Sequence, residues 1–119
     1  MSQQPDAAST CLFCRIAAGT VPATIVHSDD TTVAFRDINP QAPTHILVIP
    51  RRHISDAAAA AGETVWQAVM SRATQIALGE NLGERGYRLV INAGPDAGQS
   101  VDHLHVHVLG GRAMRWPPG

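Results

Sequence analysis

The sequence predicts an α+β fold, with a mainly antiparallel five-stranded sheet, one short helix and one long helix. Two observations indicate this class. The expected order of elements is a helix, three strands, a helix and two strands, and consecutive strands are joined by hairpin-like turns rather than by repeated helical crossovers. The chain also contains no internal repeat. At 119 residues it is long enough for one buried core, so one domain is expected.

The N-terminal part divides into a tail and a short helix. Residues 1–10 are small and polar without periodicity, so we expect a disordered tail before a single domain over 11–119. Residues 11–19 place apolar side chains at helical spacing. The run stops at Gly19, and glycine often follows a helix end because it accepts a left-handed backbone.

Three strands follow this helix. Residues 24–37 carry two β-branched runs around a pair of aspartates, which is typical of a hairpin. Residues 38–44 contain two prolines and predict a loop, because proline lacks the backbone N–H that a sheet requires. Residues 45–49 form a compact apolar run that suits a central strand, and Pro50 ends it.

A long amphipathic helix is expected next. The alanine-rich residues 57–82 repeat apolar side chains near the 3.6-residue period. Ser55 or Asp56 can cap its start, because a short polar side chain satisfies the first backbone N–H groups. Gly62 is the point at which the helix can break.

Two further strands are expected near the C-terminus. They cover residues 86–94 and 101–111, and the loop 95–100 between them is rich in small and turn-forming residues. The closing Trp-Pro-Pro-Gly cannot form regular structure, because two consecutive residues lack a backbone donor.

Composition limits the partners of the protein. Nine basic and ten acidic residues leave a formal net charge of -1, so no extended surface for nucleic acid or anionic lipid is indicated. The N-terminus lacks the basic and apolar regions of a secretory signal, and the aliphatic run at 46–49 is far shorter than the roughly 20 residues that cross a bilayer. We expect no nucleic-acid partner, no membrane association and a cytoplasmic location.

The two cysteines, Cys11 and Cys14, are separated by two residues. This spacing suits a metal site or a redox pair better than a structural disulfide, which stabilises most when it closes a long loop. The redox interpretation is the weaker one, because a thioredoxin-like motif follows a strand and this one follows the expected tail. The pair fits a reducing compartment.

Three of the six histidines stand at alternate positions, 103, 105 and 107, with aliphatic residues between them. On a strand, alternate residues share a face, so the imidazoles form a row with steps of about 7 Å. One metal ion cannot easily bind all three, because its ligand atoms must converge within about 4 Å. Another interpretation is that the three histidines only form the polar face of a strand and have no chemical role.

Imidazole chemistry suggests a third interpretation. Histidine can attack phosphorus, transfer protons near neutral pH and bind phosphate oxygens. The preceding residues 94–100 read Gly-Pro-Asp-Ala-Gly-Gln-Ser and offer glycines and a hydroxyl that can form a backbone nest for an anion. Together these features favour phosphoryl or nucleotidyl transfer.

One stretch resembles the motif of the histidine triad (HIT) superfamily, namely His103-Leu104-His105-Val106-His107-Val108-Leu109. The sequences at 34–55, 86–94, 97–112 and 116–119 are similar to the Hint branch of that superfamily. The resemblance covers roughly the whole expected domain. It implies a HIT-like fold and a homodimer that hydrolyses purine nucleoside phosphoramidates, such as adenosine 5'-monophosphoramidate, and aminoacyl adenylates.

The resemblance also implies roles for individual histidines. His105, the middle member, is the nucleophile that attacks the α-phosphorus and forms a transient nucleotidyl-histidine. His107 donates to the phosphate, and His45 lines the site and assists proton transfer to the leaving amine. On its own, a histidine such as His45 is more often structural, so its role rests on the match of residues 42–50 to the family. Together with His103, these residues form the expected catalytic set.

Further positions match the nucleotide-binding residues of the family. They comprise a phosphate-contacting loop, a ribose-binding acid, an apolar base pocket and a C-terminal tryptophan that approaches the partner's site in the dimer. Without the resemblance, the acid can be a turn residue and the apolar residues can be core. The positions are Leu12, Phe13, Ile16, Phe35, Asp37, Ile38, Leu47, Asn92, Gly98, Gln99, Ser100 and Trp116.

Some members of the bacterial type carry paired cysteines and bind a structural zinc ion. The matching positions are Cys11, Cys14, His53 and His103, a complete set for a tetrahedral site. Unligated thiols are the alternative. Zinc bound there would hold the N-terminal helix and the first imidazole of the triad, which is a structural role.

The sequence therefore predicts a hydrolase of purine nucleoside 5'-phosphoramidates with structural zinc. A nucleotide-binding interaction module with incidental hydrolase activity is the alternative. In both cases the expected ligand is a purine nucleoside monophosphate derivative.

Overall fold

The computed structural model describes residues 10–119, so the predicted tail lies outside the described residues except for Thr10. The elements follow the predicted order and confirm the α+β class. A short 3-10 helix, η1, is added in the loop before the last strand. The elements are α2 (Leu12–Ala17), β1 (Ile25–Ser28), β2 (Thr32–Arg36), β3 (Thr44–Pro50), α3 (Val65–Gly79), β4 (Tyr87–Val90), η1 (Pro95–Ala97) and β5 (Val106–Gly110).

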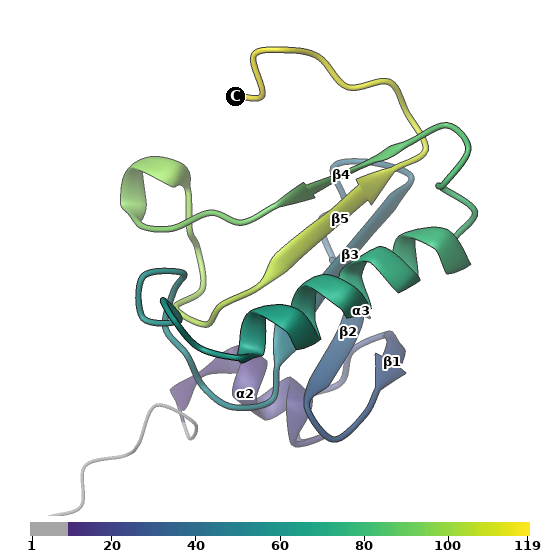
Figure 1. Ribbon diagram of the computed structural model, residues 1–119. Coiled ribbons are helices and arrows are strands. Elements are labelled where there is room, and N and C mark those ends of the chain that lie inside the picture. The colour runs from purple at the N-terminus through teal and green to yellow at the C-terminus, as the bar shows by residue number, and fades with distance from the viewer. Residues whose placement is uncertain (1–9) are drawn as a thin grey trace, which may run out of the picture.

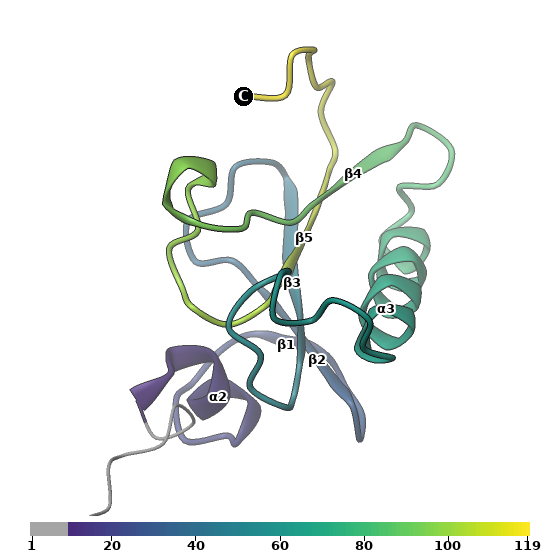
Figure 2. The ribbon, with the colours of Figure 1, turned by 60° about the vertical axis from the view of Figure 1, so that its left-hand side comes forward.

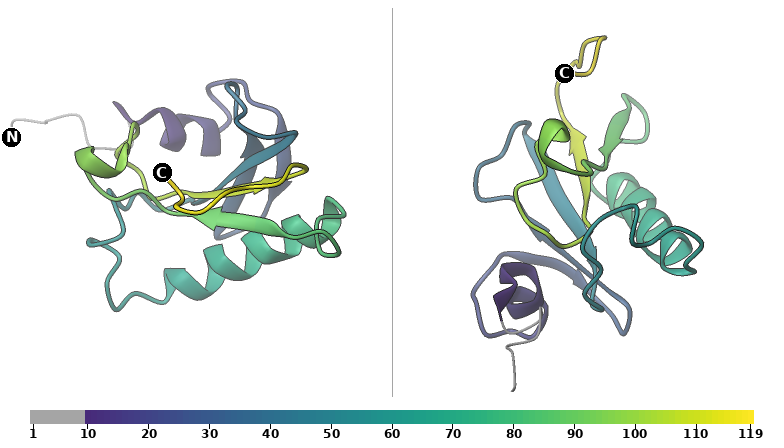
Figure 3. Two further views of the ribbon diagram at one scale, coloured as in Figure 1. Left: turned by 90° about the horizontal axis from the view of Figure 1, so that it is seen from above. Right: turned by 90° about the vertical axis from the view of Figure 1, so that its left-hand side faces the viewer.

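The five strands form one antiparallel sheet in the order β1-β2-β3-β5-β4 (Figure 1). The central strand β3 pairs with β2 from Pro50 opposite Thr32 to Ile46 opposite Arg36, and with β5 on its other side. The two helices cover opposite faces of the sheet, α2 one face and α3 the other (Figures 2 and 3). Successive strand residues point to opposite faces, so each strand contributes to two separate layers.

The face under α3 is packed with aliphatic side chains. Val69, Ala73, Ile76 and Ala77 lie on one stripe of α3, at the spacing that a helix needs to present a single apolar face. This stripe packs on alternate residues of the inner strands. The strand residues of this cluster are Ala34, Ile46, Val48, Val106 and Val108.

The face under α2 has a mixed character. Phe13 and Ile16 of the helix pack against Val33, Phe35, Leu47 and Ile49 of the sheet. The far end of α2 is held by Arg51, whose Nη1 donates to the carbonyl of Ala17 at 2.9 Å. Polar histidine side chains continue this face beyond the apolar cluster, and they form the candidate site.

The long helix is shorter than predicted. α3 begins at Val65, whereas residues 57–62 form turns closed by i to i+3 bonds such as Ala60 N–H to Ala57 O. Asp56 does cap a backbone N–H as expected, but that N–H belongs to one of these turns. Alanine is the best helix former, but helix propensity is a weak preference that specific contacts override, and here the carbonyl of Ala60 accepts from the Trp66 indole. No helix within residues 10–119 is long and apolar enough to cross a membrane.

The last strand is also shorter than predicted. β5 begins at Val106, so the prediction that all three triad histidines share one strand face is wrong for the first two. The partner strand β3 ends at Pro50, which has no backbone N–H to continue the ladder. Leu104 donates to the carbonyl of Ile54 instead, which bends this segment out of the sheet.

Two smaller predictions can also be compared with the structure. Gly19 follows the end of α2 with φ +79, the left-handed conformation expected of a glycine at this place. The strand expected at 86–94 ends at Val90, and the residues after it form the loop that contains η1.

Candidate functional site

Two clusters of polar side chains lie on the α2 face of the sheet. The first, here called the cysteine–histidine cluster, contains Cys11, Cys14, His53 and His103. The second, the histidine relay, contains Asp37, His45 and His107. His105 lies between the two clusters, its ring centroid 4.9 Å from that of His107.

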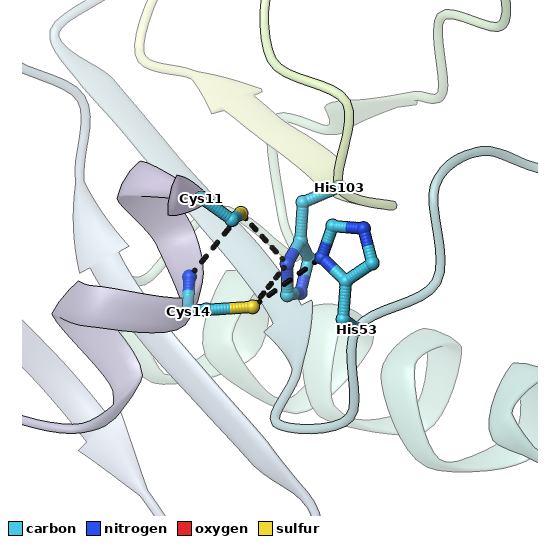
Figure 4. A group of neighbouring side chains, drawn as sticks. All are labelled: Cys11, Cys14, His53 and His103. Atoms are coloured by element: carbon cyan, nitrogen blue, oxygen red, sulfur yellow. Dashed lines mark hydrogen bonds between the residues drawn. The ribbon is translucent and has the colours of Figure 1, made fainter. Parts of the chain in front are cut away.

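The cysteine–histidine cluster joins three distant parts of the chain (Figure 4). The two thiols come from α2 and its N-cap, His53 from the loop after β3, and His103 from the segment before β5. Cys14 Sγ lies 3.3 Å from Nδ1 of His53 and 3.4 Å from Nδ1 of His103. Cys11 Sγ lies 3.3 Å from the same nitrogen of His103. Four ligand atoms thus converge on one point.

The geometry of the cluster fits a tetrahedral metal ion. The ligand atoms all lie within 4.8 Å of one another. A zinc ion with bonds of about 2.3 Å to sulfur and about 2.0 Å to nitrogen places its ligand atoms at roughly this separation. Two sulfurs with two imidazole nitrogens are also a donor set that zinc prefers. The residues that match the family's metal positions are therefore brought together.

His103 is oriented for such a site by the backbone. Its Nε2 lies 2.9 Å from the carbonyl of Pro50, so Nε2 carries the hydrogen and Nδ1 presents its lone pair to the thiols. The side chain is fully buried. Burial is the main reason that the pKa of His103 falls to about 4, and the neighbouring His53 and His105 lower it further. The neutral form, which metals bind, is thereby favoured.

His105 has the opposite orientation. Its Nδ1 lies 2.6 Å from the carbonyl of His103 and therefore donates to it. The lone pair is then on Nε2, the other ring nitrogen. Burial lowers the pKa of His105, which keeps the ring neutral at physiological pH. A neutral imidazole with a fixed tautomer and a free lone pair is suited to nucleophilic attack.

In the histidine relay, one backbone hydrogen bond to His45 fixes which ring nitrogens of His45 and His107 carry hydrogen. The backbone N–H of Gln41 donates to Nδ1 of His45 at 3.0 Å. Nε2 of His45 must then carry its hydrogen, which it donates to Nδ1 of His107 at 2.9 Å. As a result, His107 carries its own hydrogen on Nε2. The carboxylate of Asp37 lies 3.5 Å from Nε2 of His45 and can stabilise positive charge there.

The outer nitrogen of His107, Nε2, has no hydrogen-bond partner in the described part of the chain. Nε2 of this residue is buried, and no acceptor within residues 10–119 approaches it. A buried donor without a partner costs about 1–3 kcal/mol, so such groups are rare unless a ligand supplies the acceptor. Burial first, and then the adjacent His105 and His45, lower the pKa of His107 to about 4. The free N–H is thus a neutral donor.

The same tautomers argue against a metal ion in the relay, although its three ligand atoms are close together. A metal on Nε2 of His45 would need the lone pair there and the hydrogen on Nδ1. The N–H of Gln41 already occupies Nδ1, and two donors would then face each other. The relay is therefore a chain of hydrogen bonds.

His105 and His107 line an apolar cleft of about 330 Å³. This volume is within the range of small-molecule sites. All six residues predicted for a base pocket line it, together with the predicted Asp37 and Ser100. Ile38 is 99% exposed and stands at its rim. The apolar lining residues are Leu12, Phe13, Ile16, Val21, Pro22, Ala23, Phe35, Ile38, Leu47 and Val101.

The structure does not bring every predicted site residue to this cleft. Asn92, Gly98 and Gln99 are not among its lining residues, and Trp116 is 83% exposed on the C-terminal segment. The amide of Gln99 accepts from Gly94 N–H in its own loop at 2.9 Å and donates to Ser55 O in the loop after β3 at 2.8 Å. This side chain shapes the loop that carries Ser100.

Sequence reasoning missed the groups that set the tautomers. The N–H of Gln41 and the carbonyls of Pro50 and His103 act through the backbone, so the identity of their side chains carries no signal. Five lining residues were also missed, namely Val21, Pro22, Ala23, Arg36 and Val101. The first three stand between the first helix and the hairpin, and only the packing of these two elements brings them to the cleft.

Comparison with known proteins agrees with this fold and site. The HIT domain model matches residues 18–114. The chain therefore belongs to the HIT family. Among curated relatives, it is 45% identical over 129 residues to the 14 kDa zinc-binding protein of Zea mays, covering 100% of both chains. It is 49% identical to a HIT-like protein of Synechococcus elongatus, covering 91% of this chain and 96% of the relative.

Solved structures with the same fold include hydrolases and metal-bound members. A HIT family hydrolase from Legionella pneumophila is 50% identical, with a TM-score of 0.88 over 92% of this chain and 99% of that chain. A zinc-bound histidine triad family protein from Mycobacterium smegmatis is 35% identical, with a TM-score of 0.73 over 88% and 77%. A histidine triad nucleotide-binding protein from Candida albicans is 27% identical, with a TM-score of 0.79 over 92% and 84%.

Proposed function

We propose that this protein hydrolyses purine nucleoside 5'-phosphoramidates, with aminoacyl adenylates as further substrates, through a nucleotidyl intermediate on His105. The observation that carries the proposal is the pairing of two groups in one cleft. Nε2 of His105 has a lone pair, and the adjacent His107 has an N–H donor without a partner. A phosphoryl centre needs both, a nucleophile for phosphorus and a donor for its oxygens.

The rest of the cleft suits a nucleoside monophosphate. Its apolar walls between α2 and the sheet can hold a base, and we assign Phe13, Phe35 and Leu47 to this role. Asp37 is at the edge of the cleft, where a carboxylate can accept hydrogen bonds from both ribose hydroxyls. Ser100 offers a hydroxyl near the triad for the phosphate. The relatives whose names mention nucleotide binding and hydrolysis support the same assignment.

In the proposed mechanism, the lone pair of His105 Nε2 attacks the α-phosphorus and the phosphorus–nitrogen bond to the leaving amine breaks. His107 Nε2–H passes its proton to that amine, and His45 Nε2–H, 2.9 Å from His107 Nδ1, keeps His107 in the tautomer that can do so. Water then gives a proton to the vacated His107 Nε2 and attacks the nucleotidyl-histidine, and the bond to His105 breaks, so that both imidazoles return to their neutral forms. The carboxylate of Asp37 near His45 Nε2 favours the hydrogen on that nitrogen.

Substitution of the nucleophile tests this function. We expect His105→Gly to lower turnover of adenosine 5'-monophosphoramidate by at least about 10⁴-fold, because the covalent route is lost. Binding of AMP, measured by calorimetry, should survive. Turnover equal to that of the wild type would refute the proposal. Tight AMP or GMP binding with negligible wild-type turnover on any phosphoramidate would favour a nucleotide-binding interaction module instead.

We also propose that the cysteine–histidine cluster holds one structural zinc ion. Its donor set, its convergent geometry and two zinc-binding relatives support this assignment. Zinc would supply a fixed link between α2, the loop after β3 and the triad segment. Metal analysis of protein purified without added metal should give about one zinc per chain, and Cys11→Ser should abolish it. Absence of metal in both proteins would refute the site.

The quaternary state and location complete the proposal. We infer a homodimer of the Hint type in the cytoplasm. β4 is an edge strand with one unpaired side, and the exposed Trp116 lies outside the cleft of its own chain. Reduced thiols, which the cluster requires, are maintained in that compartment. Sedimentation equilibrium should give twice the chain mass, and the mass of a single chain would contradict the dimer.

A further inference from the structure

His103 belongs to both functional regions through two different atoms. Its imidazole Nδ1 faces the two thiols at 3.3 and 3.4 Å. Its main-chain carbonyl accepts the Nδ1 hydrogen of His105 at 2.6 Å. Because the ring and the carbonyl are in one residue, a displacement of the ring moves the group that sets the tautomer of His105.

Helix α2 provides a second link between the regions. It carries Cys14, and Cys11 is its N-cap, while Phe13 between them contacts His105 edge to face at 5.1 Å and 88°. α2 has six residues, too few for a helix that is stable on its own. Its position therefore depends on the contacts at its ends and on its buried face. The cysteines hold the N-terminal end, where Phe13 meets His105.

We propose that Cys11, Cys14 and His53 are positioning residues for His105. With a metal ion bound, they fix the ring of His103 and the start of α2, and these two elements fix the tautomer and the orientation of His105. The cluster thus prepares the active form of the site in addition to stabilising the fold. The inference rests on the proposed function only where it identifies His105 as the nucleophile.

The alternative is a cluster that stabilises the fold and nothing more. In that case, loss of the metal lowers the melting temperature and leaves the remaining folded molecules with an unchanged His105. The two cases differ in the state of the His105 ring below the melting temperature, which can be measured without any substrate.

The test uses Cys11→Ser and His53→Asn. Within residues 10–119, the polar and ring contacts of these two side chains are with Cys14 and His103 rather than with His105, so a direct effect on the nucleophile is avoided. Metal content is measured first. The tautomer of His105 is then read from long-range ¹H–¹⁵N correlations of the imidazoles in ¹⁵N-histidine-labelled protein, and kcat and KM are measured on the same samples.

In the wild type we expect one metal ion per chain and a hydrogen on Nδ1 of His105. In both variants we expect metal loss, a mixture of tautomers at His105 and a decrease in kcat of about 10–100-fold, the usual effect of removing groups that orient a reacting one. Chelation of the wild type should produce the same changes, and added zinc should reverse them.

Ile76→Ala is the matched control. Ile76 lies on the buried side of α3, the helix that covers the other face of the sheet, so its loss destabilises the protein without touching either cluster. We expect a lower melting temperature with an unchanged tautomer and kcat. If Cys11→Ser does not fold, the same measurements are made on His53→Asn and on the chelated wild type, because both keep Cys11 as the N-cap that accepts from Cys14 N–H.

Two results would overturn the proposal. One is a metal-free, folded variant whose His105 keeps its Nδ1 hydrogen and whose kcat is unchanged. The other is a metal-loaded wild type in which His105 has its hydrogen on Nε2. Failure of the proposed function would give a different pair of results. The tautomer of His105 would still depend on the metal, but His105→Gly would retain turnover.

Discussion

The cysteine–histidine cluster and the histidine relay with His105 lie on the same face of the sheet, yet they use opposite nitrogens of their imidazoles. In the cluster, His103 gives its Nε2 hydrogen to a carbonyl and offers Nδ1 to the thiols. Two residues later, His105 gives its Nδ1 hydrogen to a carbonyl and keeps the Nε2 lone pair for the cleft.

The difference shows how one short segment serves two kinds of chemistry. A backbone carbonyl selects the nitrogen that carries the hydrogen, and the other nitrogen is then free to act. The surroundings decide what it acts on. Sulfur ligands surround the free nitrogen of His103, whereas an apolar cleft and a second imidazole surround that of His105.

The largest effect should come from the cluster. Cys14→Ser, or removal of metal with a chelator, is expected to lower the free energy of unfolding by at least about 3 kcal/mol, because metal binding and folding are coupled. Urea unfolding at pH 7.5 measures this change. His27→Ala, a histidine of the hairpin outside both clusters, is the control. A chelator that leaves the urea midpoint unchanged would contradict a metal-dependent fold.

Within the relay, the effect should fall on catalysis. We expect His107→Ala to lower kcat about 10²-fold, or about 2.7 kcal/mol, since it removes the donor for the phosphate and the leaving amine. Metal content should stay at the wild-type value, because His107 is not in the cluster. If the substitution removed the metal and left kcat intact, the division between the two regions would be wrong.

The dependence of stability on pH should report the relay as well. The pKa of His107 is lowered to about 4 from 6.5, so the unfolded chain binds a proton in this interval and the folded chain does not. Stability is therefore complete above pH 6.5 and falls as the pH decreases toward 4. By linkage, this histidine contributes a loss of about 1 kcal/mol between pH 7.5 and 6.

Unfolding free energies measured at both pH values in wild type and His107→Ala test this assignment. The variant should show a smaller loss on acidification. An equal loss in both proteins would place the titrating group elsewhere.

The smallest effect is expected at the loop before the triad. Gln99→Ala removes the amide contacts to Gly94 and Ser55 and should cost about 0.5–1 kcal/mol, because the site is partly exposed. We expect a higher KM with little change in kcat, since the loop carries Ser100. Steady-state kinetics separates the two constants. An unchanged KM would show that the loop does not contribute to the cleft.

Much of the site could be predicted from residue types and spacing. The two cysteines, the three alternating histidines and the apolar run at 45–49 are local patterns, and each has a specific chemical or packing consequence. The fold class was confirmed for the same reason, because hairpins and periodic apolar residues are local features.

The predictions that failed concern the ends of elements. The alanine-rich stretch carried a helical pattern from 57, but its first turns close on themselves and α3 begins at Val65. The last strand begins at Val106, because Pro50 of β3 has no backbone N–H for the ladder and Leu104 donates to the carbonyl of Ile54 instead. In both cases specific hydrogen bonds outweigh a weak local preference.

The sequence by itself determined which atoms are available for chemistry, two thiols, six imidazoles and a few carboxylates, and which residues prefer strand or helix. Only the tertiary structure decided which nitrogen of each imidazole is free, because that choice depends on which backbone N–H or carbonyl the folded chain places beside each ring. The carbonyls of Pro50 and His103 and the N–H of Gln41 make this choice. Every residue type supplies the same carbonyl, and every type except proline the same N–H, so the sequence carries no trace of it.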